Sequence, residues 1–268
     1  MGRIESTFAR LRQQGETALI PFITAGDPDL GRTEVLIHTL VEAGADIIEL
    51  GFPFSDPMAD GPVIQAASER ALAAGTTLPA ILEMVARVRQ HTNVPIVLMG
   101  YYNPILHYGP TRFARDAAVA GVDGLLLVDL PPEEADEVHG DLRAADVRLI
   151  TLLAPTSPPE RMARLAAAGE GFLYYVSMTG VTGVNQVDAA AIESAVRSLR
   201  AQSSVPVAVG FGISSPADAA AVGAFADAVV VGSALVKVIA AYGSSPELQP
   251  QVGAFIGALK QSLHRRAA

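Results

Sequence analysis

The chain has 268 residues, half of them hydrophobic and 18% charged, and 19 Lys and Arg against 28 Asp and Glu give a net charge of −9. This apolar content excludes disorder, the absence of Cys excludes disulfide scaffolds, Cys-ligated zinc, iron–sulfur clusters and thiol catalysis, and the acidic balance argues against a general nucleic-acid-binding protein. No run of about 18 apolar residues predicts a membrane span and the first residues lack a signal-peptide core, so we predict a soluble, cytoplasmic protein.

Short runs rich in Ile, Val and Leu recur along the chain, each followed by a turn and a helical pattern. Continuous apolar runs of this kind are typical of parallel strands that are covered on both faces. We predict eight strands, at Ala18–Thr24, Asp46–Leu50, Pro95–Met99, Gly124–Val128, Arg148–Leu152, Phe172–Val176, Pro206–Val209 and Asp227–Val231.

Helical patterns separate these runs. We predict helices at Ile4–Gln13, Thr33–Ala43, Leu78–Gln90, Thr111–Ala120, Glu133–Ala145, Pro159–Ala168, Asp188–Ala201, Pro216–Val222 and Val252–Leu263. Alternation of this kind over roughly 250 residues predicts an α/β protein of one domain, residues 1–268, folded as a (β/α)8 TIM barrel with an extra N-terminal helix. An open doubly wound sheet is the alternative, but no composition break or long linker divides the chain.

Two loops that follow predicted strands are unusually long. They span residues 51–62 and 177–186, whereas such loops commonly have about 2–6 residues. In a barrel of this kind the active site is built from these loops. The Gly and Thr content of the second loop predicts a lid that orders over a substrate.

Glu49 is the most informative single residue, because it lies in a strand that is otherwise apolar. Burial raises the pKa of a carboxyl toward a range useful for acid–base chemistry. The alternative is a buried ion pair, for which the predicted strands offer only Arg148, at the opposite end of the barrel. Asp56 and Asp60 follow in the next loop, where each has an ordinary explanation as a turn residue or a helix N-cap. A functional role is favoured for Asp60 because its loop follows the strand that carries Glu49, which could place both carboxylates around one ligand.

A second set of residues predicts a phosphate site. Gly183, Gly212 and the pair Gly232-Ser233 follow three successive strands, and Ser233 precedes a possible short helix. Barrels of this type bind phosphate with backbone N–H groups of such loops and the N-terminus of a short helix. Tight turns alone would also explain these glycines.

Some reaction types are disfavoured by the residues that the chain contains. Its only lysines, Lys237 and Lys260, lie in the C-terminal helical region, which disfavours a Schiff-base aldolase. Its five histidines are scattered without metal-ligand spacing, so we predict no metal site. His107 follows the third strand, but a surface role at a helix end is the better interpretation. Of the reaction types considered, acid–base chemistry by carboxylates is the one that these residues still allow.

Residues 48–62, with the sequence IELGFPFSDPMADGP, closely resemble the signature of the tryptophan synthase alpha subunit family. The likeness covers essentially the whole chain, through PFITAGDP at 21–28, MGYYNP at 99–104, GVTG at 180–183, GFGIS at 210–214 and VGS at 231–233. It implies the cofactor-free retro-aldol cleavage of indole-3-glycerol phosphate to indole and glyceraldehyde 3-phosphate, a step of tryptophan biosynthesis.

The resemblance also implies roles for individual residues. Glu49 is expected to be the general acid/base at indole C3 and the glycerol hydroxyl, and Asp60 the carboxylate that binds the indole N–H. Thr182 resembles the residue of the lid that contacts the catalytic Asp on closure. Aromatic residues that flank the indole are expected at Phe22, Tyr101, Tyr174 and Phe211, with Tyr174 chosen over Tyr175 for its spacing to Ser177. Phosphate-binding positions are matched by Gly183, Gly212, Gly232 and Ser233.

The family's partner is a beta subunit, with which the alpha subunit forms an alpha2beta2 heterotetramer and to which it passes indole. Pyridoxal phosphate is therefore expected only in the partner. Asp56 and the loops 53–60 and 178–190 are expected at or near the contact. A sugar-phosphate isomerase on the same type of barrel, and a barrel that only activates a beta subunit, are the alternatives. Glu49 and Asp60 argue against the second of these.

Overall fold

The computed structural model describes residues 2–176, 189–210 and 212–263. Among these residues, nine strands form one parallel sheet in the order β5-β4-β3-β2-β1-β9-β8-β7-β6. The strands are β1 Ala18–Thr24, β2 Ile48–Gly51, β3 Ile96–Gly100, β4 Gly124–Leu127, β5 Arg148–Leu149, β6 Thr151–Leu153, β7 Leu173–Val176, β8 Val207–Gly210 and β9 Ala228–Val231. All eight predicted strands are present, with ends that differ by at most two residues from the prediction.

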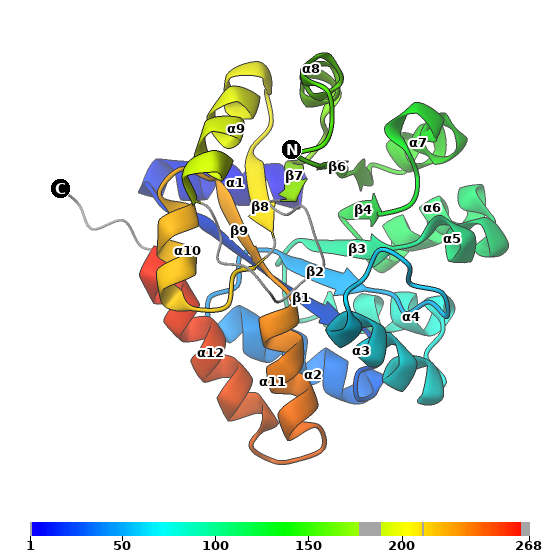
Figure 1. Cartoon of the computed structure of the whole chain (residues 1–268). Helices are drawn as coiled ribbons and strands as arrows, with labels where there is room; N and C mark the ends of the chain where they lie inside the picture. The colour runs from blue at the N-terminus through cyan, green and yellow to red at the C-terminus, as the bar shows by residue number, and fades with distance from the viewer. Residues whose placement is uncertain (1, 177–188, 211, 264–268) are drawn as a thin grey trace.

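The ninth strand arises because the fifth predicted strand is divided at Ile150. Its first part, β5, pairs with β4, and its second part, β6, pairs with β7. The Ile150 N–H still bonds to the Leu125 carbonyl, at 2.8 Å. One segment of chain thus changes neighbour within six residues and brings the two ends of the sheet together into a nearly closed (β/α)8 barrel (Figure 1).

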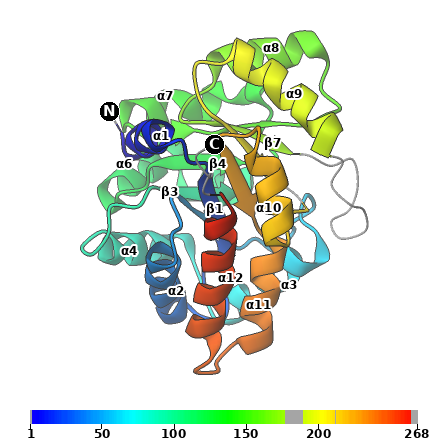
Figure 2. The ribbon, with the colours of Figure 1, turned by 90° about the vertical axis from the view of Figure 1, so that its left-hand side faces the viewer.

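Helices surround the sheet on the outside (Figures 1 and 2). The α-helices are α1 Arg3–Gln14, α2 Leu30–Glu42, α3 Pro62–Ala73, α4 Leu78–Val88, α5 Tyr102–Tyr108, α6 Pro110–Ala120, α7 Asp136–Ala144, α8 Pro159–Ala168, α9 Ala189–Gln202, α10 Pro216–Gly223, α11 Ser233–Tyr242 and α12 Leu248–Leu263, with a 3-10 turn, η1, at Pro132–Glu134. Figure 2 shows α12 packed between α2 and α11. Among the described residues no single helix is long and apolar enough to cross a membrane, and α3 and α4 meet that test only as a pair bent by 94°.

Two helices were not predicted. Helix α3 buries only the small side chains of Ala67, Ser68 and Ala71, so it lacks a clear apolar stripe in the sequence. Helix α5 has seven residues and contains Asn103-Pro104, a pair that is typical of a turn. Helix α5 follows β3 almost directly, whereas α3 follows β2 after the loop 52–61; both lie at the carboxyl end of the barrel, and tertiary packing decides their conformation.

Polar side chains cap the first turn of some of the helices. Asp29 caps α2 by accepting a hydrogen bond from the Arg32 N–H, and Ser215 forms a capping box at α10. Helices α6 and α8 have Gly109 and Pro158 at their N-caps, without a side-chain cap, and both begin at prolines, which favour the first helical turn.

The extra N-terminal helix lies against the amino-terminal end of the barrel. Its buried residues Ile4, Phe8 and Leu11 join the apolar cluster inside the barrel, and the Phe8 ring packs on Phe172 with 5.9 Å between centroids. Helix α1 therefore closes the end of the barrel at which the strands begin, and the opposite end is left for a site.

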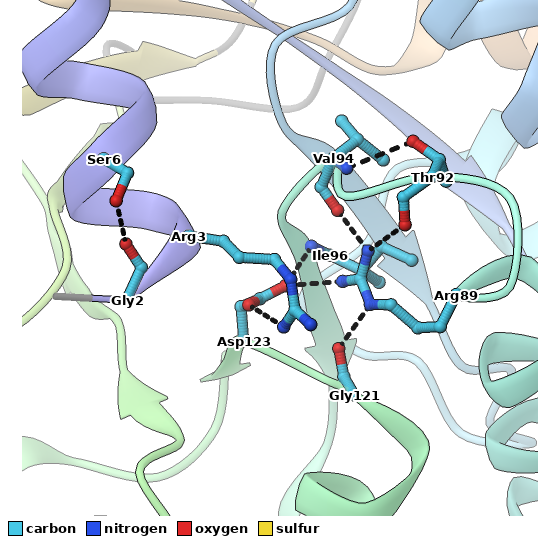
Figure 3. A network of polar contacts seen from close by, with 9 residues as sticks. All are labelled: Gly2, Arg3, Ser6, Arg89, Thr92, Val94, Ile96, Gly121 and Asp123. Carbon is cyan, nitrogen blue, oxygen red and sulfur yellow. Dashed lines mark hydrogen bonds and ion pairs between the residues drawn. The ribbon is translucent and has the colours of Figure 1, made fainter.

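Two buried aspartates and one half-buried aspartate hold the amino-terminal end together. Asp46, Asp123 and Asp227 each precede a strand and accept a hydrogen bond from a backbone N–H of a neighbouring strand; the donors are Leu19, Ile96 and Val207, at 2.9, 2.8 and 3.0 Å. Figure 3 shows Asp123, which also binds Arg3 of α1 at 3.0 Å and the buried Arg89. The carboxylate of Asp123 thus connects the start of β3 with helix α1.

Asp123→Ala is expected to lower the free energy of unfolding by about 3 kcal/mol, because it leaves the buried Arg89 without its ion-pair partner. Urea denaturation measures this change. Asp146→Asn is the control at the same end of the barrel: it removes the exposed charge that pairs with Arg148 but keeps a residue type that accepts the positive φ of 59° at this position, and it is expected to cost less than about 1 kcal/mol. Equal losses in the two variants would contradict a special role of the buried pair.

Candidate functional site

Glu49 lies inside the barrel near the carboxyl ends of the strands. It is in register with Phe22 of β1 and Val97 of β3, and only 1% of its surface is exposed. Its Oε1 atom has no hydrogen-bond partner among the described residues. The alternative of an ion pair with Arg148 is wrong, because Arg148 pairs with Glu5 and Asp146. A buried carboxyl held in this way is available to a ligand.

The surroundings of Glu49 keep it protonated at neutral pH. Burial raises the pKa of Glu49 from 4.5 to about 8, and the charge of Asp60 adds to the rise. A carboxyl that titrates near pH 8 is an effective proton donor and acceptor at neutral pH.

Asp60 lies in the loop between β2 and α3, half-buried in a pocket next to Glu49. This pocket is lined by Phe22, Thr24, Gly51, Phe52, Asp60, Ile64, Ser68, Met99, Gly100, Tyr101 and Val128. Burial raises the pKa of Asp60 from 3.8 to about 6, and a hydrogen bond with the Tyr101 hydroxyl acts in the opposite direction. Asp60 does not cap α3, whose N-cap is Gly61. At neutral pH the site therefore pairs a protonated Glu49 with an ionised Asp60.

Side chains from two elements hold the Asp60 loop. The Tyr101 hydroxyl accepts a hydrogen bond from the Ala59 N–H at 3.0 Å, and its ring packs on Phe54 with 5.3 Å between centroids. From α3, Gln65 donates to the backbone carbonyl of Asp60 at 2.8 Å. The sequence analysis missed Phe54 and Gln65. The sequence feature that could have identified them is their position, since both lie within six residues of Asp60.

Small residues make room for the aromatic side chains of the site. A Cβ atom on Gly51 would lie 2.7 Å from the Phe22 ring, and one on Gly210 would overlap the Tyr174 hydroxyl. Tyr174 belongs to the apolar cluster inside the barrel, and the charge of Glu49 contributes to its raised pKa, whereas Tyr175 belongs to the cluster outside the barrel. Of the two tyrosines weighed from the sequence, Tyr174 is thus the one near Glu49.

The predicted phosphate residues lie at two neighbouring strand ends. Gly212 follows β8 with a positive φ of 78°, and Gly232 and Ser233 follow β9, where Ser233 is the first residue of α11. A Cβ atom on Gly232 would lie 3.8 Å from that of Phe22, so this turn borders the Glu49 pocket. The N-terminus of α11 is favourable for an anion. Thr182, Gly183 and Phe211 lie outside the described residues.

The remaining predicted residues lie on the surface or at the far end of the barrel. Asp56 is exposed and accepts a hydrogen bond from Ser55 at 2.5 Å, and His107 is exposed in the last turn of α5. Lys237 is exposed on α11, and Lys260 pairs with Asp46 at 2.8 Å at the amino-terminal end. Neither lysine lines the pocket that contains Asp60.

Comparison with known proteins agrees with this geometry. Residues 8–263 match the family model described as tryptophan synthase alpha chain. Relatives of that name from Citrifermentans bemidjiense and Geobacter sulfurreducens are each 57% identical to this chain over 263 residues. Each match covers 98% of this chain; it covers 98% of the first relative and 99% of the second. The crystal structure of tryptophan synthase subunit alpha from Legionella pneumophila is 42% identical, with a TM-score of 0.91 and coverage of 99% of this chain and 100% of that one. The chain belongs to the tryptophan synthase alpha chain family.

Proposed function

We propose that Glu49 and Asp60 catalyse the reaction of this family, the cleavage of indole-3-glycerol phosphate to indole and glyceraldehyde 3-phosphate. As a member of the family, the chain is a carbon–carbon lyase of tryptophan biosynthesis. The observation that supports the catalytic pair is a buried Glu49 without a described partner at Oε1, beside an Asp60 that ionises near pH 6. A sugar-phosphate isomerase does not account for the family match.

The proposed mechanism uses one proton donor and one fixed negative charge. Protonated Glu49 gives its proton to indole C3, and the positive charge that spreads to the ring nitrogen is stabilised by Asp60. Ionised Glu49 then takes the proton of the glycerol hydroxyl next to C3. The hydroxyl electrons form the aldehyde C=O, the electrons of the broken C–C bond return to the ring, and Glu49 ends protonated.

We propose that Phe22, Tyr101, Tyr174 and Phe211 surround the indole ring. Thr182 is proposed to contact Asp60, and the phosphate is proposed to bind at Gly183, Gly212, Gly232 and Ser233. The position of Ser233 at the start of α11 supports the last assignment. The N–H groups at a helix N-terminus attract an anion even when the net charge of the protein is negative.

The family name implies a beta-subunit partner, and we propose an alpha2beta2 heterotetramer in the cytoplasm in which Asp56 and the loops 53–60 and 178–190 lie near the contact. The exposed Asp56 and a Met58 that is 86% exposed support this location. Pyridoxal phosphate is bound in enzymes through a lysine. Because Lys237 is exposed and Lys260 is engaged in ion pairs, we assign this cofactor to the beta subunit.

The first experiment is indole release from indole-3-glycerol phosphate by the purified chain, with and without a pyridoxal-phosphate beta subunit. We expect slow cleavage by the chain alone and faster cleavage with the partner. Absence of cleavage in both conditions would refute the proposed activity. Turnover of a phosphoribosyl aldose under the same conditions would favour the isomerase.

The pH dependence of kcat/KM is expected to be bell-shaped, with limbs near pKa 6 and 8, because the reaction needs Asp60 ionised and Glu49 protonated. The two values belong to the interacting pair. Tyr101→Phe removes a hydrogen bond that lowers the pKa of Asp60, so the acidic limb is expected to move to higher pH. Initial rates between pH 5 and pH 9 test both statements, and an unchanged acidic limb in the variant would exclude Asp60 as its origin.

A further inference from the structure

Thr24, the last residue of β1, carries a buried hydroxyl that the proposed mechanism does not use. Only 3% of the residue is exposed, and its Oγ1 atom has no hydrogen-bond partner among the described residues. An unsatisfied buried hydroxyl destabilises a fold, so such groups usually have a partner in a ligand or a bound water.

The position of Thr24 places this hydroxyl in the substrate pocket. In a strand, residues two apart point to the same face, so Thr24 shares the interior face of β1 with Phe22, which is in register with Glu49. Thr24 itself is in register with Gly51, whose lack of a side chain leaves room for the Phe22 ring beside it. It lines the pocket together with Asp60 and Tyr101.

The order of the strands indicates which part of the substrate Thr24 meets. β1 lies between β2, which carries Glu49 and leads to Asp60, and β9, which leads to Gly232 and Ser233. Indole C3 and the ring N–H are assigned to Glu49 and Asp60 on the first side, and the phosphate contacts of Gly232 and Ser233 are on the second side. The glycerol chain joins indole C3 to the phosphate, so the shortest path between these two sides runs along β1. Of its two hydroxyls, the one next to indole C3 reacts with Glu49, which leaves the middle hydroxyl, next to the phosphate-bearing carbon, for another partner.

We propose that Thr24 binds the middle hydroxyl of the substrate's glycerol chain through a hydrogen bond to Oγ1. This inference rests on the proposed assignment of the indole and phosphate ends of the site. The bond holds the glycerol chain while the reacting hydroxyl stays free for Glu49, so Thr24 selects substrates with a hydroxyl at the middle carbon.

The test compares two proteins on two substrates: the native chain and Thr24→Val, each with indole-3-glycerol phosphate and with its analogue that lacks the middle hydroxyl. The analogue keeps the reacting hydroxyl and can still be cleaved. Thr24→Val is expected to lower kcat/KM for the full substrate by about fivefold to tenfold, as for the loss of one hydrogen bond. For the deoxy analogue the two proteins are expected to agree within about twofold, and Thr24→Ser is expected to restore cleavage of the full substrate.

Stability provides an independent readout. Val has nearly the shape of Thr without the hydroxyl, so Thr24→Val is expected to have an unfolding temperature equal to or above that of the native protein. An equal loss of kcat/KM on both substrates would overturn the proposal in favour of a water or another part of the chain as the partner. No loss on either substrate would also overturn it. Failure of the proposed reaction is recognised separately, because the native chain would then cleave neither substrate.

Discussion

Glu49→Gln is expected to lower kcat for indole release by about a thousandfold, because Gln can neither donate a proton to indole C3 nor accept one from the hydroxyl. The amide has nearly the size of the carboxyl, so the packing against Phe22 and Val97 is retained. The measurement is a single-turnover assay of indole formation at saturating substrate, which separates chemistry from product release. Near-normal turnover would show that Glu49 is not the acid–base group.

The stability of the same variant distinguishes lost chemistry from a lost fold. Glu49 has a pKa of 4.5 in the unfolded chain and about 8 in the folded protein, so the folded state binds more protons between these values and its stability falls as the pH rises through this range. Gln has no proton to lose, and each pKa unit corresponds to about 1.4 kcal/mol. Glu49→Gln is therefore expected to be more stable than the native protein at pH 8, by several kcal/mol, and equally stable at pH 4. Lower stability at pH 8 would contradict the burial of an unpaired carboxyl.

Asp60→Asn is expected to lower kcat by about 10²-fold to 10³-fold, because a neutral amide no longer stabilises the positive charge that develops on the indole ring. The carboxylate oxygen that accepts the indole N–H has a counterpart in the amide, so substrate affinity is expected to change less than kcat. Steady-state kinetics of indole release measures both parameters. A large rise in KM at unchanged kcat would show that Asp60 contributes only to binding.

Asp56→Asn is the matched control, since Asp56 lies four residues earlier in the same loop and is exposed. It removes the same charge without reaching the pocket lined by Asp60 and Tyr101. The isolated Asp56→Asn chain is expected to cleave the substrate at the native rate. A loss as large as that of Asp60→Asn would assign both effects to a disturbed loop rather than to charge at the site.

The strands were predictable because burial on both faces requires continuous apolar runs. Residues 18–24 are all buried, and β1 begins and ends where the sequence predicts. The division of the segment 148–153 was not predictable, since the change of partner at Ile150 depends on where β4 and β7 lie. Helices α3 and α5 were missed for a related reason: α3 lacks a clear apolar stripe, and α5 has only seven residues, too few for a helical period to be recognised.

Some residues of the site could likewise be predicted from the sequence, and others could not. Glu49 could be identified from the sequence because a single carboxyl in an apolar strand has few explanations, and Asp60 followed from its place in the next loop. Gln65 and Phe54 could not be assigned, because a hydrogen bond to the Asp60 carbonyl and a ring contact with Tyr101 are set by the packing of three elements. The choice between Tyr174 and Tyr175 also required the structure, since neighbouring residues of a strand point to opposite faces.

The sequence by itself thus determined the barrel, the family resemblance and the two carboxyls, because each leaves a local pattern of residue types along the chain. Only the tertiary structure decided that Arg148 does not neutralise Glu49, that Asp60 raises the pKa of Glu49, and that Thr24 faces the same pocket. These properties depend on desolvation and on distances between residues that are far apart in sequence, and no local pattern encodes them.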